Sequence, residues 1–205
     1  MKKKGFLLVI SGPSGVGKGT VCQALLKNND MIKYSISATT RPKRPGEKSG
    51  DDYFFLSIDE FEKGIEEGMF LEYASVHGNL YGTPKQFVMD GIDNGEVIVL
   101  EIDVQGALQV KENYPNGVFV FLLPPSMEEL ERRLTHRGTE SEEQLKLRLN
   151  NARGEISKIN EYQYAVINDT VDNAVTHINN IIDAEGLRVI NNLSLDKYLQ
   201  EEKND

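Results

Sequence analysis

The segment that most restricts the fold of this chain is a short glycine-rich run. Residues 12–18 read Gly-Pro-Ser-Gly-Val-Gly-Lys and match the pattern G-x-x-x-x-G-K. An apolar run at residues 5–10 precedes the pattern, and residues 18–28 place apolar side chains on one helical face. Between a strand and a helix, such glycines let backbone N–H groups turn towards phosphate oxygens, and the helix N-terminus adds positive potential. The segment therefore predicts a loop that binds the phosphates of a nucleoside triphosphate.

One position in this loop departs from the usual motif. Lys18 supplies a mobile positive charge for the outer phosphates, but the hydroxyl residue that normally follows is replaced by Gly19, with Thr20 next. Because Gly19 has no side chain that could ligate Mg²⁺, a hydroxyl contact with the metal must come from Thr20 or be absent. The candidate triphosphate-binding residues are Gly12, Pro13, Ser14, Gly15, Val16, Gly17, Lys18, Gly19 and Thr20.

Strongly apolar runs alternate with helical segments along most of the chain. Predicted strands cover residues 5–10, 31–36, 97–102, 118–123 and 164–167. Predicted helices cover residues 18–28, 59–68, 104–112, 126–136, 142–162, 172–185 and 192–201. This alternation predicts an α/β fold with a parallel sheet. Residues 37–90 interrupt it with short aromatic β segments, which indicates an inserted subdomain.

Two acidic residues, Glu101 and Asp103, close the strand predicted at residues 97–102. At the C-terminal edge of a parallel sheet they would lie beside the phosphate loop. Carboxylates at that place can hold Mg²⁺ through its waters or face a second substrate. Asp103 also directly precedes a predicted helix, so a role as the N-cap of that helix stays open.

The charge of the chain limits its partners. Lys and Arg number 23 and Asp and Glu 32, which gives a net charge of −9. Nucleic acid and anionic membranes both require a basic face, and no apolar run approaches the roughly 20 residues that cross a bilayer. We therefore expect no nucleic-acid partner, no membrane partner and a cytoplasmic location. Between residues 33 and 48, however, five basic residues accompany one acid. This basic segment is either a site for a small anion or a solvated loop.

Five sequence blocks, in family order, resemble the guanylate kinase family, whose members phosphorylate GMP from ATP. They lie at residues 11–18, 35–47, 50–55, 100–106 and 137–140, and with weaker matches they cover about residues 5–185. The resemblance implies a P-loop kinase core whose parallel sheet is flanked by helices, an inserted mixed α/β GMP-binding subdomain and a helical lid. It implies core residues 1–36, 91–135 and 156–205, a GMP-binding subdomain at 37–90 and a lid at 136–155.

The resemblance also implies where each substrate binds. GMP would contact Ser37, Arg41, Arg44, Tyr53, Glu72, Tyr81, Thr83 and Asp103. ATP would lie on the phosphate loop, with its adenine near Arg137, Asn168 and Asp169. The candidate catalytic residues are Lys18, Arg41, Arg133, Arg137 and Arg148. Mg²⁺ would be held by Thr20 and, through water, by Glu101. The expected partners are thus ATP and GMP, and the oligomeric state, monomer or homodimer, stays open.

The residue types suit these roles. Arginine makes bidentate, charge-assisted bonds to phosphate. The carboxylate of Glu72 can accept from the N1–H and N2–H₂ groups of guanine, while the hydroxyl of Ser37 can donate to O6. Adenine carries an amino group at the 6-position and has no N1–H. A buried site of this kind would therefore reject AMP, because its polar groups would be left unpaired.

Three alternatives stay open. The chain could be a kinase of the same fold for another small phosphate, although Ser37 and Glu72 would then have no base to recognise. It could be a non-catalytic binding module, although the intact phosphate loop argues against that function. In their glutamate-rich helices, Arg133 and Arg148 could also serve only as ion-pair partners of acids one turn away.

Overall fold

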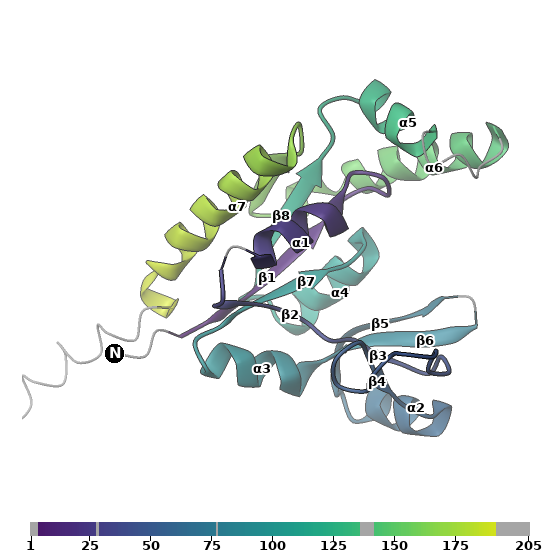
Figure 1. The fold of residues 1–205 in the computed structure, drawn as a ribbon, viewed down its shortest axis with the longest axis vertical. Helices are drawn as coiled ribbons and strands as arrows, with labels where there is room; N and C mark the ends of the chain where they lie inside the picture. Colours follow the sequence, from purple (N-terminus) through teal and green to yellow (C-terminus); the bar gives the residue numbers. More distant parts are fainter. Residues whose placement is uncertain (1–3, 28, 77, 136–141, 192–205) are drawn as a thin grey trace, which may run out of the picture.

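The core of the molecule is a five-stranded sheet. The computed structural model describes residues 4–27, 29–76, 78–135 and 142–191. All strands of this sheet are parallel, and their order is β2-β7-β1-β8-β9. Their bounds are β1 Phe6–Ser11, β2 Ile32–Tyr34, β7 Val97–Glu101, β8 Val118–Leu123 and β9 Tyr164–Ile167. Because β1 lies in the middle of the sheet, the phosphate loop that follows it starts at the centre of the C-terminal edge (Figure 1).

Helices cover both faces of this sheet, which confirms the predicted α/β class. The core helices are α1 Lys18–Lys27, α3 Lys85–Asp93, α4 Val104–Asn113, α5 Met127–Thr135, α6 Glu142–Ile156 and α7 Val171–Gly186. On β1, Leu8 and Ile10 pack in the cluster that contains α1 and α7, whereas Leu7 and Val9 pack in the cluster of α3 and α4. Side chains of a strand alternate between faces, so a strand that is covered on both sides has to be apolar throughout.

A second, smaller sheet forms most of the inserted region. Its strand order is β4-β3-β6-β5. The bounds are β3 Ala38–Thr39, β4 Phe54–Phe55, β5 Phe70–Val76 and β6 Asn79–Pro84, and helix α2 spans Ile58–Glu66. Ser57 and Glu60 form a capping box at the start of α2. The rings of Phe61 and Phe70 stack at 4.3 Å between centroids and join α2 to the sheet. This unit lies below the core sheet in Figure 1.

Two elements differ from the prediction. Helix α3 was not predicted, and its N-cap residue Pro84 offers no side-chain hydrogen bond that could mark its start. The predicted boundary of the subdomain at residue 90 falls inside this helix. The helix predicted at residues 142–162 ends at Ile156, where the Ser157 hydroxyl donates to the Gly154 carbonyl at 2.7 Å, and a short 3₁₀ helix, η1 Ile159–Glu161, follows. The helix predicted at residues 192–201 lies outside the described residues.

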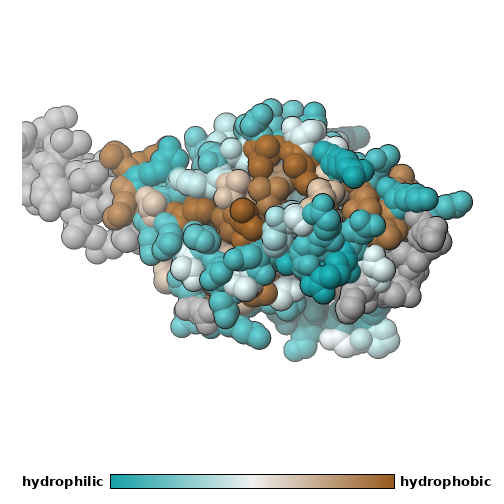
Figure 2. All heavy atoms as spheres, turned by 90° about the horizontal axis from the view of Figure 1, so that it is seen from above, coloured by the Kyte–Doolittle hydropathy of each residue, from teal (hydrophilic) through white to brown (hydrophobic). Residues whose placement is uncertain are grey.

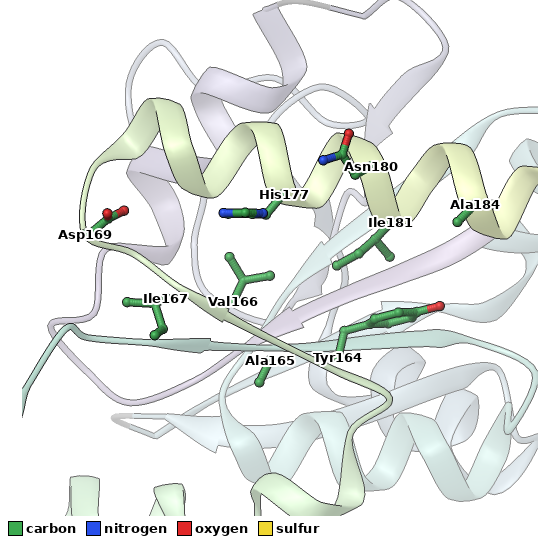
Figure 3. A pocket seen from close by; sticks show the side chains of 9 residues that line it. All are labelled: Tyr164, Ala165, Val166, Ile167, Asp169, His177, Asn180, Ile181 and Ala184. Atoms are coloured by element: carbon green, nitrogen blue, oxygen red, sulfur yellow. The ribbon is translucent and has the colours of Figure 1, made fainter.

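The surface carries two further features. No helix of the described residues is both long and apolar enough to cross a membrane. A groove of about 600 Å³ lies between β9 and α7, lined by Val166, Ile167, Ile181 and His177 among others (Figure 3). Its lining includes the predicted site residue Asp169 but no residue of the phosphate loop. Where α7 ends, hydrophobic surface borders the grey atoms in Figure 2; Leu187, Val189 and Ile190 are exposed in this region.

Candidate active site

The phosphate loop joins β1 to α1, and three of its glycines hold left-handed backbone. Gly12, Gly15 and Gly17 have φ values of 149°, 88° and 96°. All three also lack room for a side chain, and a Cβ on Gly15 would stand 2.6 Å from the Leu134 side chain. A Cβ on Gly12 would stand 2.3 Å from the Leu122 carbonyl oxygen, and a Cβ on Gly17 would stand 2.7 Å from the Asn168 amide nitrogen. The sequence pattern therefore reflects both backbone conformation and close packing against the sheet.

Lys18 folds back over this loop. Its ammonium group donates to the carbonyl oxygens of Gly12 at 2.7 Å and Pro13 at 3.3 Å. Burial lowers the pKa of Lys18, while the nearby carboxylates of Glu101 and Glu155 oppose this shift. The loop thus keeps a positive charge at the place where phosphate oxygens would meet its backbone N–H groups.

Two residues predicted near ATP brace the loop from behind. The Asn168 amide donates to the Val16 carbonyl at 2.8 Å, and Asn168 is only 5% exposed. The Arg133 guanidinium donates to the same carbonyl at 3.2 Å and to the Asn168 carbonyl at 2.9 Å, while Glu129 holds it at 2.7 Å. Arg133 therefore makes the predicted pair with an acid one turn away and also contacts the loop. These bonds fix the loop against β9 and α5.

Asp169 lies at the start of α7. Its carboxylate accepts from the Thr170 backbone N–H at 2.7 Å and from the Asn173 amide at 3.1 Å. Both bonds lower the pKa of Asp169. The side chain is exposed and borders the groove between β9 and α7, whose lining includes no residue of the phosphate loop.

The acidic strand end separates its two carboxylates. Glu101 accepts a hydrogen bond from the Tyr34 hydroxyl at 2.9 Å, and its oxygens lie 3.5 and 3.6 Å from the place of a Cβ on Gly19. Asp103 is the N-cap of α4 and accepts from the Gly106 N–H at 2.8 Å, as the alternative for this residue predicted. Thr20 is exposed on the first turn of α1. Glu101 thus lies beside the first turn of α1.

Three of the predicted GMP-phosphate residues, Arg41, Tyr53 and Tyr81, lie together at the small sheet. The Arg41 guanidinium lies 5.4 Å from the centroid of the Tyr53 ring, and the rings of Tyr53 and Tyr81 are 6.1 Å apart. Arg41 makes a two-pronged bond with Glu47, with N–O distances of 2.7 and 3.1 Å, and the Arg44 backbone N–H also donates to Glu47 at 2.7 Å. The hydrogen bonds between Arg41 and Glu47 raise the pKa of Arg41 and lower that of Glu47. The Arg44 side chain is exposed.

A small pocket of about 170 Å³ lies between the subdomain and α4. Its lining includes four of the predicted GMP-binding residues, Ser37, Glu72, Tyr81 and Asp103. Glu72 is buried, and its carboxylate accepts from the buried Thr83 hydroxyl at 2.6 Å. Burial raises the pKa of Glu72, although the Thr83 bond opposes this shift. The pocket therefore contains the buried Glu72 carboxylate, which Thr83 orients, and Asp103 lies in the same lining.

The remaining arginines belong to the predicted lid region. Helices α5 and α6 pack through Leu130, Leu134 and Ala152. Arg148 lies half-buried on α6. Arg137 lies outside the described residues.

Sequence reasoning missed two polar partners in the site. Glu47 is the single acid in the basic segment. An acid surrounded by basic residues is expected to form an ion pair, and this pattern could have indicated its bond with Arg41. Tyr34 bonds to Glu101 across 67 residues of sequence, and no local pattern indicates such a contact.

Comparison with known proteins shows the family of this chain. A family model described as guanylate kinase matches residues 4–185. The chain belongs to the guanylate kinase family. It is 59% identical over 189 residues to a guanylate kinase of Clostridium acetobutylicum, with 92% of this chain and 90% of that protein covered. It is 54% identical over 202 residues to a guanylate kinase of Caldanaerobacter subterraneus subsp. tengcongensis, with 98% of each covered.

A solved guanylate kinase shares the fold as well. The crystal structure of guanylate kinase from Anaplasma phagocytophilum aligns with a TM-score of 0.72 and 36% sequence identity, over 97% of this chain and 95% of that one. The guanylate kinase match therefore includes the phosphate loop, the small sheet and most of α7, and so covers both clusters described above.

Proposed function

We propose that this chain transfers the γ-phosphoryl group of ATP to GMP, and to dGMP, to give ADP and GDP. The observation that supports this function best is the buried Glu72–Thr83 pair, whose carboxylate lines a pocket together with Tyr81. Two separate clusters of residues are suited to phosphate. One cluster is the loop around Lys18. The other, the Arg41 cluster, consists of Arg41, Arg44, Tyr53 and Tyr81. A single triphosphate needs only the first. The second cluster and the pocket beside it suit an acceptor that has both a phosphate and a base.

The ATP side uses backbone groups and Lys18. The loop N–H groups surround the β- and γ-phosphates, and the Lys18 ammonium neutralises charge on the outer oxygens. Arg133 holds the loop in place and, with Arg137 and Arg148, supplies positive charge near the transferred group. The acceptor phosphate oxygen attacks the γ-phosphorus while the bond to the β-phosphate oxygen breaks, so ADP leaves with that bonding pair. Because a phosphate oxygen is already a nucleophile, the site needs alignment and charge neutralisation more than a general base.

The GMP-binding residues contact both the phosphate and the guanine base of the acceptor. Arg41 and Arg44 bind its phosphate, and the hydroxyls of Tyr53 and Tyr81 add neutral donors. At the base, the Glu72 carboxylate accepts from N1–H and N2–H₂ of guanine, Ser37 donates to O6, and Asp103 lies in the same pocket. Thr83 keeps the carboxylate in one orientation through its 2.6 Å hydrogen bond. AMP lacks the N1–H donor and would leave Glu72 buried without its partner.

The residues beside the phosphate loop fit a magnesium ion that arrives with ATP. Mg²⁺ is commonly held by one or two carboxylates together with water and substrate phosphates. Glu101 provides such a carboxylate next to α1, and Thr20 adds a hydroxyl on the first turn of that helix. Among the described residues no group of three or more His, Cys, Asp and Glu could hold a metal ion alone, so phosphate oxygens would complete this site. When bound, Mg²⁺ would neutralise charge on the β- and γ-phosphates.

The cellular setting belongs to the same proposal. Phosphorylation of GMP and dGMP places the chain in purine nucleotide metabolism, where it returns GMP to the diphosphate pool. We propose a cytoplasmic location, since free ATP and GMP are its substrates. The family resemblance supports a division into the phosphate-loop core, a GMP-binding subdomain at 37–90 and a lid at 136–155.

An acceptor panel tests this function. The protein is mixed with ATP and Mg²⁺, and ADP formation is followed with GMP, dGMP, AMP, CMP, UMP or ribose 5-phosphate as acceptor. We expect rapid turnover with GMP and dGMP and little with the others. Absence of turnover with GMP, or faster turnover with AMP, contradicts the proposal, and a preference for ribose 5-phosphate would favour a small-phosphate kinase.

A further inference from the structure

We propose that Tyr34 is a positioning residue for the nucleotide site and orients the Glu101 carboxylate. Its hydroxyl would supply the hydrogen bond that a serine or threonine at position 19 would give the same carboxylate. The inference rests on the proposed role of Glu101 beside ATP and Mg²⁺. It concerns the departure from the phosphate-loop motif at Gly19, and it assigns a function to a tyrosine that lies outside both predicted substrate sites.

The sheet register places Tyr34 and Glu101 on one face. Strands β2 and β7 are parallel neighbours, and Tyr34 pairs with Val99. Glu101 follows Val99 by two residues, so its side chain points to the same face. A diagonal pair of this kind is within reach of an aromatic side chain, and the Tyr34 hydroxyl bonds Glu101 Oε2 at 2.9 Å. Since Tyr34 ends its strand at the sheet edge, its ring approaches the site from outside the core.

Helix α1 faces Glu101 from the other side, with no side chain at position 19. A Cβ on Gly19 would lie 3.5 Å from Glu101 Oε1 and 3.6 Å from Oε2, which is ordinary van der Waals contact. A serine would therefore fit, and its hydroxyl could reach the carboxylate. The Gly19 backbone is not left-handed, so a side chain there adds no conformational strain. Glycine at this position leaves the carboxylate without a hydroxyl donor from residue 19.

Glu101 also acts electrostatically on two α1 residues. Its carboxylate opposes the lowering of the Lys18 pKa by burial, and it adds to the rise of the pKa of the buried Cys22 thiol to about 12, which burial mainly causes. A carboxylate without a fixed partner would rotate towards Lys18 and neutralise the charge that phosphate needs. The Tyr34 bond opposes that rotation because it occupies Oε2 and leaves Oε1 to the site.

The test measures nucleotide binding rather than turnover. The dissociation constant of ADP is determined by calorimetry, once with Mg²⁺ and once with EDTA. The value in EDTA divided by the value in Mg²⁺ reports how much the metal strengthens nucleotide binding. Because a hydrogen bond to a charged group is stronger than one between neutral groups, we expect Tyr34→Phe to reduce this ratio roughly tenfold. The control Tyr73→Phe removes a hydroxyl from a tyrosine that is equally exposed, at 42%, and should leave the ratio within about twofold.

A second substitution tests whether the tyrosine replaces the missing hydroxyl. In the double variant Tyr34→Phe, Gly19→Ser, the ratio should return to within about twofold of the Gly19→Ser value, because serine now bonds the carboxylate. A wild-type ratio in Tyr34→Phe overturns the inference, and so does a loss that Gly19→Ser does not restore. Melting temperatures of all variants separate these results from unfolding.

The variant Glu101→Gln distinguishes failure of the inference from failure of the proposed site. It should reduce the ratio at least as much as Tyr34→Phe. If Glu101→Gln has no effect, the proposed role of Glu101 near the metal is wrong. If Glu101→Gln reduces the ratio but Tyr34→Phe does not, that role stands and the positioning role of Tyr34 is wrong.

Discussion

The two phosphate-binding regions are built in opposite ways. The loop before α1 consists of backbone groups, with three glycines in left-handed conformation and buried bonds from Asn168 and Arg133 behind it. The Arg41 cluster consists of long side chains in a mostly exposed segment. The Arg41 guanidinium already donates two hydrogen bonds to the Glu47 carboxylate. The loop is therefore ready for an anion before the anion arrives, whereas the cluster holds an internal carboxylate in its place.

Because the two regions are built differently, one chain can keep two phosphate sites apart. Backbone recognition is fixed by the fold and tolerates few substitutions, because each glycine meets another part of the core. Side-chain recognition is adjustable, and the GMP phosphate must share or replace the contacts that Glu47 makes with Arg41. Substitutions in the two regions should therefore fail in different ways, and the predictions below compare them.

The largest effect is expected at Lys18. The substitution Lys18→Met removes the ammonium group that donates to the Gly12 and Pro13 carbonyls, and kcat should fall by about 10³. Initial rates of ADP formation measure this loss. Calorimetry with GMP serves as the control and should give a dissociation constant within about twofold of wild type. Retention of more than a tenth of wild-type kcat would contradict this role.

The next effect concerns the geometry of Arg41. In Arg41→Lys the charge remains but the two-pronged donor is lost, so KM for GMP should rise by about 30–100-fold while KM for ATP stays unchanged. Steady-state rates at varied GMP give both constants. Arg44→Lys is the matched control and should raise KM for GMP less, since the Arg44 side chain is exposed. Equal effects of the two lysine variants would show that only charge matters in this cluster.

The substitution Glu72→Gln should weaken GMP binding by about tenfold at pH 8, because an amide cannot accept from both guanine donors. Burial raises the pKa of Glu72 in the free protein, so lowering the pH protonates the wild-type side chain early and removes its advantage. The ratio of wild-type to variant affinity should therefore shrink as the pH falls from 8 to 5. Calorimetry with GMP measures it, and titration of the GMP phosphate cancels in the ratio. A ratio independent of pH would argue against an ionised Glu72.

The smallest effect compares one glycine from each region. Gly17 and Gly46 have similar φ values of 96° and 91°, but a Cβ on Gly17 would lie 2.7 Å from Asn168, whereas one on Gly46 would meet nothing within 4 Å. Both alanine variants lose backbone freedom, so the difference between them reports the crowding alone. We expect Gly17→Ala to lower the free energy of unfolding by about 1–2 kcal/mol more than Gly46→Ala. Urea unfolding measures both, and equal losses would contradict a rigid loop beside a free one.

Local patterns predicted what short stretches of sequence determine. The strands at residues 118–123 and 164–167 appear with the predicted bounds, because buried parallel strands require continuous apolar runs. The phosphate loop was also predictable, because its glycines and Lys18 all lie within seven residues of sequence. Helix α3 escaped prediction because Pro84 gives no capping bond, its first turn has no acid and its last turn has no base.

Long-range contacts were beyond these patterns. Asn168 bonds Val16 across 152 residues and Arg133 bonds it across 117, so the bracing of the loop becomes visible only when β9 and α5 are in place. The Tyr34–Glu101 bond likewise depends on the pairing of β2 with β7. The roles of Arg137 and Arg148 stay predictions.

A crossed binding measurement tests the separation of the two sites most directly. ADP and GMP are each titrated by calorimetry into Lys18→Met and into Arg41→Lys. The account predicts that Lys18→Met weakens ADP binding by about tenfold or more with GMP unchanged, and that Arg41→Lys does the reverse. Equal weakening of both ligands in either variant would contradict two independent phosphate sites.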